Sequence, residues 1–197
     1  AGLTLEEFWN TLVSAKPVYG PLPEWADDDR YRVKLGARLQ RYDWAKDLPL
    51  KSYGKAACYC MAAAARAMED AGLSRRSMGT RRVAVIIGTT MGEIQEEEAL
   101  TERLYGGAEG DKTVFCRKYP AYHIAHAAAE LCRASGPCYV VPAACAAGNY
   151  AIAMAKRLLD GHYADIVLAG GVDVFSKVAF AGFQRLLSLA PDVCRAF

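Results

Sequence analysis

The sequence has no long hydrophobic run, no strong excess of charge of either sign, and few histidines. Its 197 residues carry 24 basic and 22 acidic side chains, which gives a formal net charge of +2. This balance excludes the basic footprint of a nucleic-acid-binding domain, and 53% hydrophobic residues exclude a disordered chain. No stretch reaches the roughly 18 apolar residues of a membrane span, and nothing at Ala1 resembles a signal peptide. We therefore expect no nucleic-acid partner and no membrane span.

The cysteines show no disulfide framework. There are seven, an odd number, and they are scattered along the chain. Small secreted domains carry an even number at regular spacing, so we expect reduced thiols in a cytoplasmic protein. The chain begins without Met, and we expect that it has been trimmed or processed.

Alternating helical and strand patterns predict an α/β protein. Helices are expected over about 5–13, 52–70, 93–104, 121–134 and 146–159, with Thr4 as the cap of the first. Strands are expected over about 83–87, 138–141 and 165–171, the second of them buried. Continuous apolar strands separated by helices predict a parallel or mixed sheet covered by helices on both faces. No repeat or linker divides the chain, so we expect one unit.

Cys145 occupies a position that favours a reactive thiolate. The second strand stops at Pro142, and a helix is expected to begin at or just after Cys145. A thiol there faces unpaired backbone N–H groups and the positive end of a helix dipole, and both favour the nucleophilic thiolate. The neighbouring residues are small, so a substrate could approach the sulfur closely. A buried structural cysteine is the alternative interpretation.

Several segments on and around this cysteine form a series: Pro142-Ala-Ala-Cys145-Ala-Ala-Gly148, Asp160-Gly-His-Tyr-Ala-Asp165 and Leu168-Ala-Gly-Gly-Val-Asp173. The series resembles the nucleophile region of β-ketoacyl synthases, in which an active-site cysteine opens a buried helix. Further landmarks fit the same family: Ala67 to Leu73, the Gly88–Gly92 turn, Gly136-Pro137, Gly182-Phe183 and Ser188 to Phe197. The resemblance covers nearly the whole chain, in order and at plausible spacing.

This resemblance implies a thiolase-like fold, of which residues 1–197 would form the N-terminal part of one synthase domain. Family members are built from two similar halves and are about double this chain. The family's opening strand and its C-terminal half are expected to be absent here. The two catalytic histidines and the lysine of the family lie in that second half, so Cys145 alone is carried over as a catalytic residue. The 197 residues by themselves are therefore expected to be inactive.

The resemblance also implies a function, the decarboxylative Claisen condensation of an acyl thioester with malonyl-carrier in fatty acid or polyketide synthesis. Cys145 would take the acyl group, and the 4'-phosphopantetheine arm would come from the acyl carrier protein rather than from a bound cofactor. Lys51 falls close to a position of the basic rim that receives this acidic carrier, although scattered surface charge is the alternative. The family pairs across a two-fold axis, which implies a homodimer, or a heterodimer with a ketosynthase-like subunit.

Two other functions stay open. A thiolase-like acyltransferase that uses coenzyme A thioesters would keep Cys145 but change the partner. A non-catalytic partner subunit of the chain-length-factor kind would pair with a competent synthase. Retention of Cys145 argues against the second, because such partners typically lose the cysteine.

Other residues could carry chemistry, but a structural role is preferred for each. His123, His126 and Glu130 share one helix face, yet their spacing is not the zinc-binding His-Glu-x-x-His pattern, and we expect a partly buried polar face. Cys58 and Cys60 lack a second cysteine pair, so we expect core packing and no metal site. The Gly88–Gly92 segment lacks the Gly-Lys-Ser/Thr ending of a phosphate loop and is interpreted as a structural turn. His162 is expected in a solvated loop.

Overall fold

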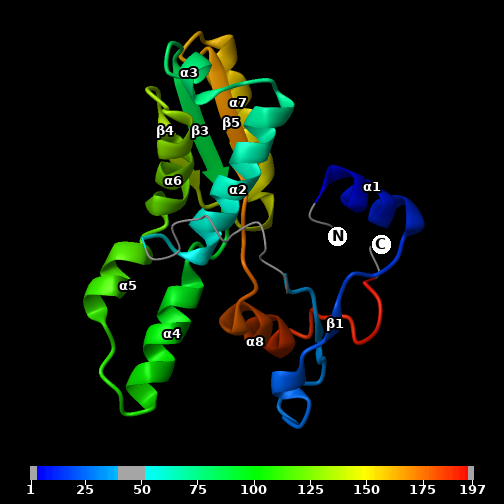
Figure 1. The fold of residues 1–197 in the computed structure, drawn as a ribbon. Helices are drawn as coiled ribbons and strands as arrows, with labels where there is room; N and C mark the ends of the chain where they lie inside the picture. The colour runs from blue at the N-terminus through cyan, green and yellow to red at the C-terminus, as the bar shows by residue number, and fades with distance from the viewer. Residues whose placement is uncertain (1–3, 40–51, 195–197) are drawn as a thin grey trace. The chain divides into compact units, whose positions relative to one another are not determined.

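The computed structural model describes residues 4–39 and 52–194. These residues form two compact units. One unit contains the described residues up to 39 and from 177 onward, and the other contains residues 52–176. The larger unit carries the sheet and Cys145, and it is shown in the upper and left parts of Figure 1.

A three-stranded parallel sheet forms the centre of the larger unit. Its strand order is β4 (Cys138–Val141), β3 (Val83–Gly88), β5 (Ile166–Gly171). Ile86 of β3 lies opposite Tyr139 and Ala169, and every residue of β3 is buried. The strand bounds agree with the predicted ones to within one residue, so the α/β prediction is confirmed.

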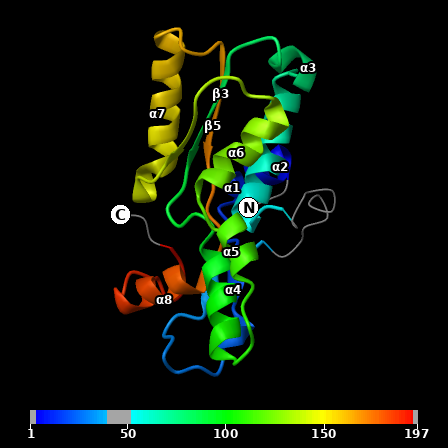
Figure 2. The same ribbon diagram turned by 90° about the vertical axis from the view of Figure 1, so that its left-hand side faces the viewer.

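Helices cover both faces of this sheet, as the apolar strands predict. Figure 2 shows α7 (Ala147–Asp160) on one side, and α2 (Lys55–Asp70) and α6 (Tyr122–Cys132) on the other. Alternate residues of β3 point to opposite faces because successive side chains of a strand alternate. Val83, Val85 and Ile87 pack with α2 and α6, whereas Ile86 packs with Ala151 and Ala155 of α7.

The strand β4 lies at the edge of the described sheet, and this corrects one prediction. Cys138 and Tyr139 are exposed, and Val140 and Val141 are only partly buried. The prediction of a buried strand is wrong because an apolar run does not distinguish a central strand from an edge strand. Within the described residues, β4 pairs with β3 alone.

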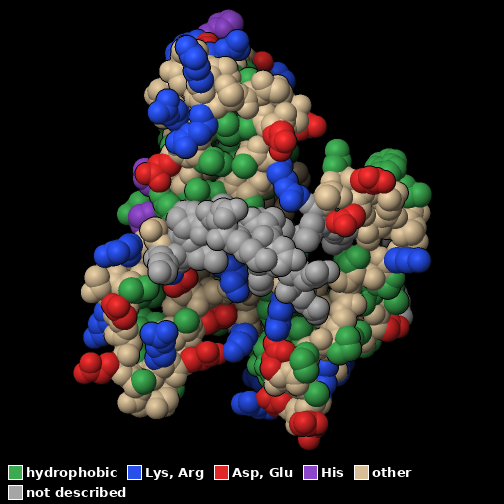
Figure 3. Space-filling view, viewed as in Figure 1, with side chains coloured by type: hydrophobic (Ala, Val, Ile, Leu, Met, Phe, Trp, Pro, Cys, Tyr) green, Lys and Arg blue, Asp and Glu red, His purple; other side chains and the backbone are tan. Residues whose placement is uncertain are grey.

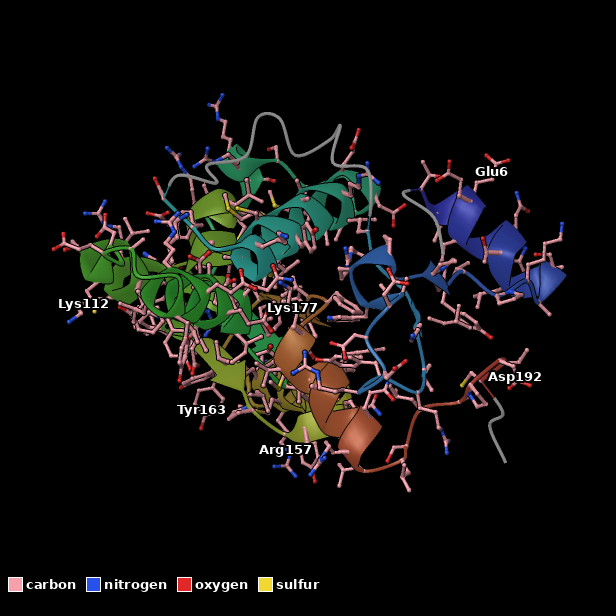
Figure 4. The ribbon with its side chains drawn as sticks, turned by 90° about the horizontal axis from the view of Figure 1, so that it is seen from below. Glu6, Lys112, Arg157, Tyr163, Lys177 and Asp192 are labelled. Atoms are coloured by element: carbon pink, nitrogen blue, oxygen red, sulfur yellow. The ribbon has the colours of Figure 1, made fainter. Side chains whose placement is uncertain are left out.

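The remaining helices of the larger unit are α3 (Arg75–Met78), α4 (Ile94–Tyr105) and α5 (Lys112–Lys118). The sequence did not predict α5, because seven residues give too little periodicity. Its start is fixed by the Asp111 carboxylate, which accepts a hydrogen bond of 3.0 Å from the Val114 N–H. Lys112, at its first residue, points away from the protein in Figure 4.

The smaller unit begins with α1 (Leu5–Ser14), whose predicted cap is confirmed. The Thr4 hydroxyl accepts from the Glu7 N–H, and the Glu7 carboxylate accepts from the Thr4 N–H, which is a capping box. Its other elements are β1 (Gly20–Pro21), the short 3-10 helix η1 (Pro23–Trp25), β2 (Leu35–Gly36) and α8 (Lys177–Arg185). The Trp25, Tyr31 and Phe180 rings form one stacked cluster, which ties η1 to α8.

None of the helices in residues 4–39 and 52–194 combines the length and the apolar character that crossing a membrane requires.

Candidate active site

The carboxyl ends of the three parallel strands meet at one edge of the sheet. Three segments leave the sheet there: Thr89 to Gly92 after β3, Pro142 to Ala146 after β4, and Val172 to Asp173 after β5. Ligands of open α/β sheets bind outside this edge. This carboxyl edge of the sheet is therefore the candidate location of an active site.

Cys145 lies at this edge, at a strand-to-helix turn. It is the middle residue of the short 3-10 helix η3 (Ala144–Ala146), which runs directly into α7. The prediction of a helix beginning at or just after Cys145 is thus confirmed. The side chain is exposed and the thiol is free, so the interpretation as a buried structural cysteine is wrong.

The turn offers a backbone donor beside this thiol. Within the part of the chain that the structure describes, no side chain caps α7, whose N-cap residue is Ala146. Among the described residues, the N–H of Cys145 has no hydrogen-bond partner. An oxyanion formed beside the sulfur could accept hydrogen bonds from such donors.

The last residue of β3 allows α7 to start close to the sheet. A Cβ on Gly88 would lie 2.3 Å from the carbonyl carbon of Ala147, whereas a Cβ on Gly171, at the end of β5, would make only an ordinary contact of 3.4 Å with the Cα of Gly148. Real Cβ atoms essentially never approach backbone as closely as 2.3 Å. Glycine is therefore required at the end of β3, and it places the turn that carries Cys145 directly on the strand ends.

The Gly88–Gly92 segment is a structural turn, as predicted. The carboxylate of Asp173 accepts hydrogen bonds from the N–H groups of Thr90 and Met91, both 3.0 Å to Oδ1, and from the Thr89 hydroxyl. A phosphate loop offers such N–H groups to a ligand. Here the protein's own aspartate occupies them.

His123, His126 and Glu130 lie together on α6 but not with Cys145. They line an open depression of about 470 Å³ with Ser52, Tyr53, Met61 and Arg117. His126 Nε2 is 3.9 Å from Glu130 Oε1, and the Tyr53 hydroxyl donates to the Glu130 carboxylate. Burial and the nearby His126 lower the pKa of His123, which is half-buried. The predicted polar face is present, but only His123 on it is partly buried, whereas His126 and Glu130 are exposed.

The structure also places the other candidate residues. Cys58 and Cys60 are buried in α2, and burial raises the pKa of their thiols to about 11 and about 12, which confirms core packing. His162 is exposed, as expected of a solvated loop. Within the residues that the structure describes, no three His, Cys, Asp or Glu side chains are grouped to hold a metal ion. Lys51 lies outside the described residues.

Basic side chains gather at the other end of the sheet. Figure 3 shows a group of them over α3, where Arg75 and Arg76 are exposed beside the amino end of β3. Arg157 of α7 and Tyr163 of the following loop also point away from the protein, as Figure 4 shows. None of these side chains belongs to the edge that carries Cys145.

Sequence reasoning missed the role of Glu93. Its side chain is 1% exposed, and its carboxylate accepts hydrogen bonds of 3.0 Å from Ala56 N–H and 2.7 Å from Ala57 N–H, at the start of α2. Burial raises the pKa of Glu93, and the two N–H bonds oppose this effect. The N-cap residue of α2 is Gly54, which has no side chain to cap the helix, and no sequence signal indicated that Glu93 takes this place.

The fold and this turn together place an exposed cysteine at the start of a helix, at the carboxyl end of a parallel sheet covered by helices on both faces. All of residues 1–197 match the sequence profile "Beta-ketoacyl synthase, N-terminal domain". The chain belongs to this family.

Individual relatives agree with this assignment. The chain is similar to Nodulation protein E of Rhizobium leguminosarum bv. trifolii, at 32% identity over 157 residues, covering 77% of this chain and 39% of that protein. It is 26% identical over 209 residues to 3-oxoacyl-(acyl-carrier-protein) synthase 2 of Synechocystis sp., covering 97% of this chain and 47% of that protein. The solved structure "The ishigamide ketosynthase/chain length factor" superposes with a TM-score of 0.87 at 30% identity, covering 98% of this chain and 49% of that one.

A structure of a β-ketoacyl synthase from Burkholderia phymatum has a TM-score of 0.79 at 23% identity, which shows the shared fold. It covers 96% of this chain and 48% of the other. Nearly the whole chain matches these relatives, but it spans only about half of their length.

Proposed function

We propose that this chain supplies the nucleophile of a β-ketoacyl-acyl-carrier-protein synthase. The observation that carries the proposal is the exposed Cys145, placed at a strand-to-helix turn on the carboxyl edge of the sheet, in a chain of this family. The reaction is the decarboxylative Claisen condensation of an acyl thioester with malonyl-carrier, and we place it in the cytoplasm. Acylation of Cys145 comes first, and carbon–carbon bond formation follows.

In the first step, the Cys145 thiolate attacks the carbonyl carbon of an acyl thioester. A sulfur–carbon bond forms and the bond to the phosphopantetheine sulfur breaks, and this sulfur leaves as a thiolate, which takes up the proton that Cys145 released when it ionised. The negative charge on the carbonyl oxygen needs hydrogen-bond donors in the transition state. The N–H of Cys145, which has no partner among the described residues, is suited to this role.

In the second step, malonyl-carrier loses carbon dioxide, and the electron pair of the broken carbon–carbon bond becomes a carbanion. The carbanion attacks the acyl carbon on Cys145, a carbon–carbon bond forms, and the thiolate leaves. In the family that the sequence resembles, two histidines assist this step. His123 and His126 do not occupy the family's histidine positions, so we do not assign the role to them. That the 197 residues alone are inactive stays a prediction.

The proposal includes two protein partners. An acyl carrier protein would supply the 4'-phosphopantetheine arm, and Lys51 remains a proposed contact for it. One solved structure that contains a chain 24% identical to this one is a type II polyketide synthase acyl-carrier protein in complex with its ketosynthase. A second subunit is supported by the exposed edge strand β4, which offers unpaired backbone groups along its outer side.

The test uses the full-length natural protein, incubated with acyl-carrier and then with malonyl-carrier. We expect a mass increase of one acyl group on the Cys145 peptide, followed by release of carbon dioxide and a β-ketoacyl product. Cys145→Ala should abolish both, whereas the matched control Cys194→Ala, which removes another exposed thiol, should abolish neither. Condensation that survives Cys145→Ala would contradict the proposal.

The same experiment separates the two alternative functions. A coenzyme A-dependent acyltransferase would acylate Cys145 from acyl coenzyme A but not from acyl-carrier. A chain-length-factor-like subunit would show neither acylation nor condensation by itself, and would restore condensation when mixed with a competent synthase. The similarity to the ishigamide ketosynthase/chain length factor supports testing this second alternative.

A further inference from the structure

The turn that carries Cys145 contains a strained residue. Ala144, directly before the cysteine, has a φ of 48°, in the left-handed region. A residue with a Cβ adopts this conformation at a cost, and such residues persist where surrounding contacts hold them. The backbone at Ala144 sets the direction in which the Cys145 side chain leaves the turn.

A side chain from a different strand end holds this residue. The hydroxyl of Thr90, in the turn after β3, donates a hydrogen bond of 3.1 Å to the carbonyl oxygen of Ala144. Thr90 is exposed, so this bond does not serve to fill the core. It links two segments 54 residues apart at the one edge where Cys145 lies.

Asp173 in turn fixes Thr90. Its carboxylate accepts from the Thr90 N–H, with distances of 3.0 and 3.2 Å to its two oxygens, and from the hydroxyl of Thr89 at 3.0 Å. The pairing of β3 with β5 places it there, because Gly88 lies opposite Gly171 and the chain continues for two residues. A charged acceptor makes these hydrogen bonds stronger than neutral ones.

We propose that Thr90 is a positioning residue that holds Ala144 in its left-handed conformation and so aims the Cys145 thiol, with Asp173 as the support of Thr90. This role rests on the proposed function only because that function makes Cys145 the nucleophile. Thr90 does not touch the reacting atoms. Its hydroxyl acts through the Ala144 carbonyl.

The test measures the rate at which iodoacetamide alkylates Cys145 in the full-length protein, followed by peptide mapping. Thr90→Val keeps the shape of the side chain and removes the donor, and we expect a rate about tenfold lower, since small misplacements of a reacting group are costly. Thr90→Ser keeps the hydroxyl and should stay within about twofold of the wild type. The matched control is Thr80→Val, because the Thr80 hydroxyl makes the same kind of bond, 3.0 Å to the Ser77 carbonyl oxygen, away from Cys145.

A second substitution tests the mechanism itself. Glycine adopts positive φ without a Cβ penalty, so Ala144→Gly should make the turn less dependent on Thr90. We expect Thr90→Val to slow alkylation clearly less in the Ala144→Gly background than in the wild type. A purely structural role for Thr90 predicts equal losses in the two backgrounds.

The outcomes are decisive in both directions. A Thr90→Val rate within about twofold of the wild type, a Thr90→Ser rate as low as that of Thr90→Val, or equal losses in the two backgrounds would each overturn the inference. Alkylation needs no condensation, so the measurement is independent of the proposed function. If the protein fails to condense but the alkylation rates follow the pattern above, the proposed function fails and the positioning role stands.

Discussion

Arg82 and Asp165 join the amino ends of β3 and β5 through a two-point ion pair. The Arg82 guanidinium donates to both carboxylate oxygens, at 2.6 and 3.2 Å, and the Arg82 N–H donates to one of them at 2.8 Å. The hydrogen bonds from Arg82 hold the pKa of Asp165 at about 2, below its ordinary value of 3.8. The pair is exposed to solvent, so its effect on stability is small.

This pair predicts a pH dependence of stability. Because the folded pKa of Asp165 is lowered, its contribution is present above about pH 4 and is lost as the pH falls toward 2. Asp165→Asn should lower the urea midpoint at pH 7, and the difference from the wild type should shrink between pH 4 and pH 2. Asp160→Asn, which removes a pair with Lys156 on the surface of α7, is the control and should have a smaller effect at pH 7. A difference that grows on acidification would contradict this prediction.

The raised pKa of Glu93 predicts a pH dependence of stability with the opposite sign. Burial raises its pKa in the folded protein, so its contribution to stability is present below about pH 4.5 and is lost as the pH rises through the raised value. Glu93→Gln carries no titrating group, and we expect this part of the pH dependence to disappear. Thermal unfolding across pH 4 to 8 measures it, with the exposed Glu69→Gln as control. An unchanged profile in Glu93→Gln would show that burial does not set the titration of this carboxyl.

Gly88→Ala tests the close approach of α7 to the sheet. The new Cβ would meet the Ala147 backbone at 2.3 Å, so α7 must shift. We expect a loss of about 1–3 kcal/mol in the free energy of unfolding and slower alkylation of Cys145. Gly170→Ala is the matched control in β5, because a Cβ there meets no atom within 4 Å. Equal effects of the two substitutions would mean that space at Gly88 is not limiting.

Cys145 should be the first cysteine to be acylated or alkylated in the full-length protein. Cys58, Cys60 and Cys132 are buried, and burial raises the pKa of each thiol, so all three should react slowly. The informative competitors are the exposed Cys116 and Cys194. Peptide mapping after limited treatment decides, and predominant labelling of either competitor would be evidence against the proposed nucleophile.

The edge strand β4 leads us to predict a homodimer of the full-length protein at micromolar concentration. Tyr139, 47% exposed, stands on this strand, and a charge at an edge opposes pairing with a second chain. Tyr139→Lys should therefore weaken the dimer in sedimentation experiments. Tyr163→Lys, at an exposed position in the loop after α7, is the control and should not. A wild type that sediments as a monomer would refute the prediction.

Local patterns predicted the elements that local physics determines. The apolar run of β3, the cap at Thr4 and the turn at Cys145 follow from neighbouring residues, and each agrees with the structure. The exposure of β4 could not be predicted, because it depends on which strand lies beside it.

The missed contacts join residues far apart in the sequence. Asp173 reaches Thr90 across 83 residues, and Glu93 caps a helix that begins 38 residues earlier, at Lys55. No spacing rule relates such pairs, since they meet only when β3 has packed against α2 and paired with β5. The position of Cys145 was therefore predictable, whereas the residues that support its turn were not.

The central position of β3 also bears on how the chain folds as it is made. Val85 cannot pair until Cys138 has been synthesised, and Val83 cannot pair until Ile166 has been synthesised. Both sides of this apolar strand stay unpaired until then. A ribosome adds roughly 5–20 residues per second, so a nascent β3 stays unpaired for seconds while α6 and α7, two of the helices that will cover it, are still being synthesised. Non-local parallel pairing is slow, and unpaired strands are prone to aggregate. The sheet edge that carries Cys145 is thus complete only after β5 has been synthesised, so the synthesis of this strand completes the candidate site.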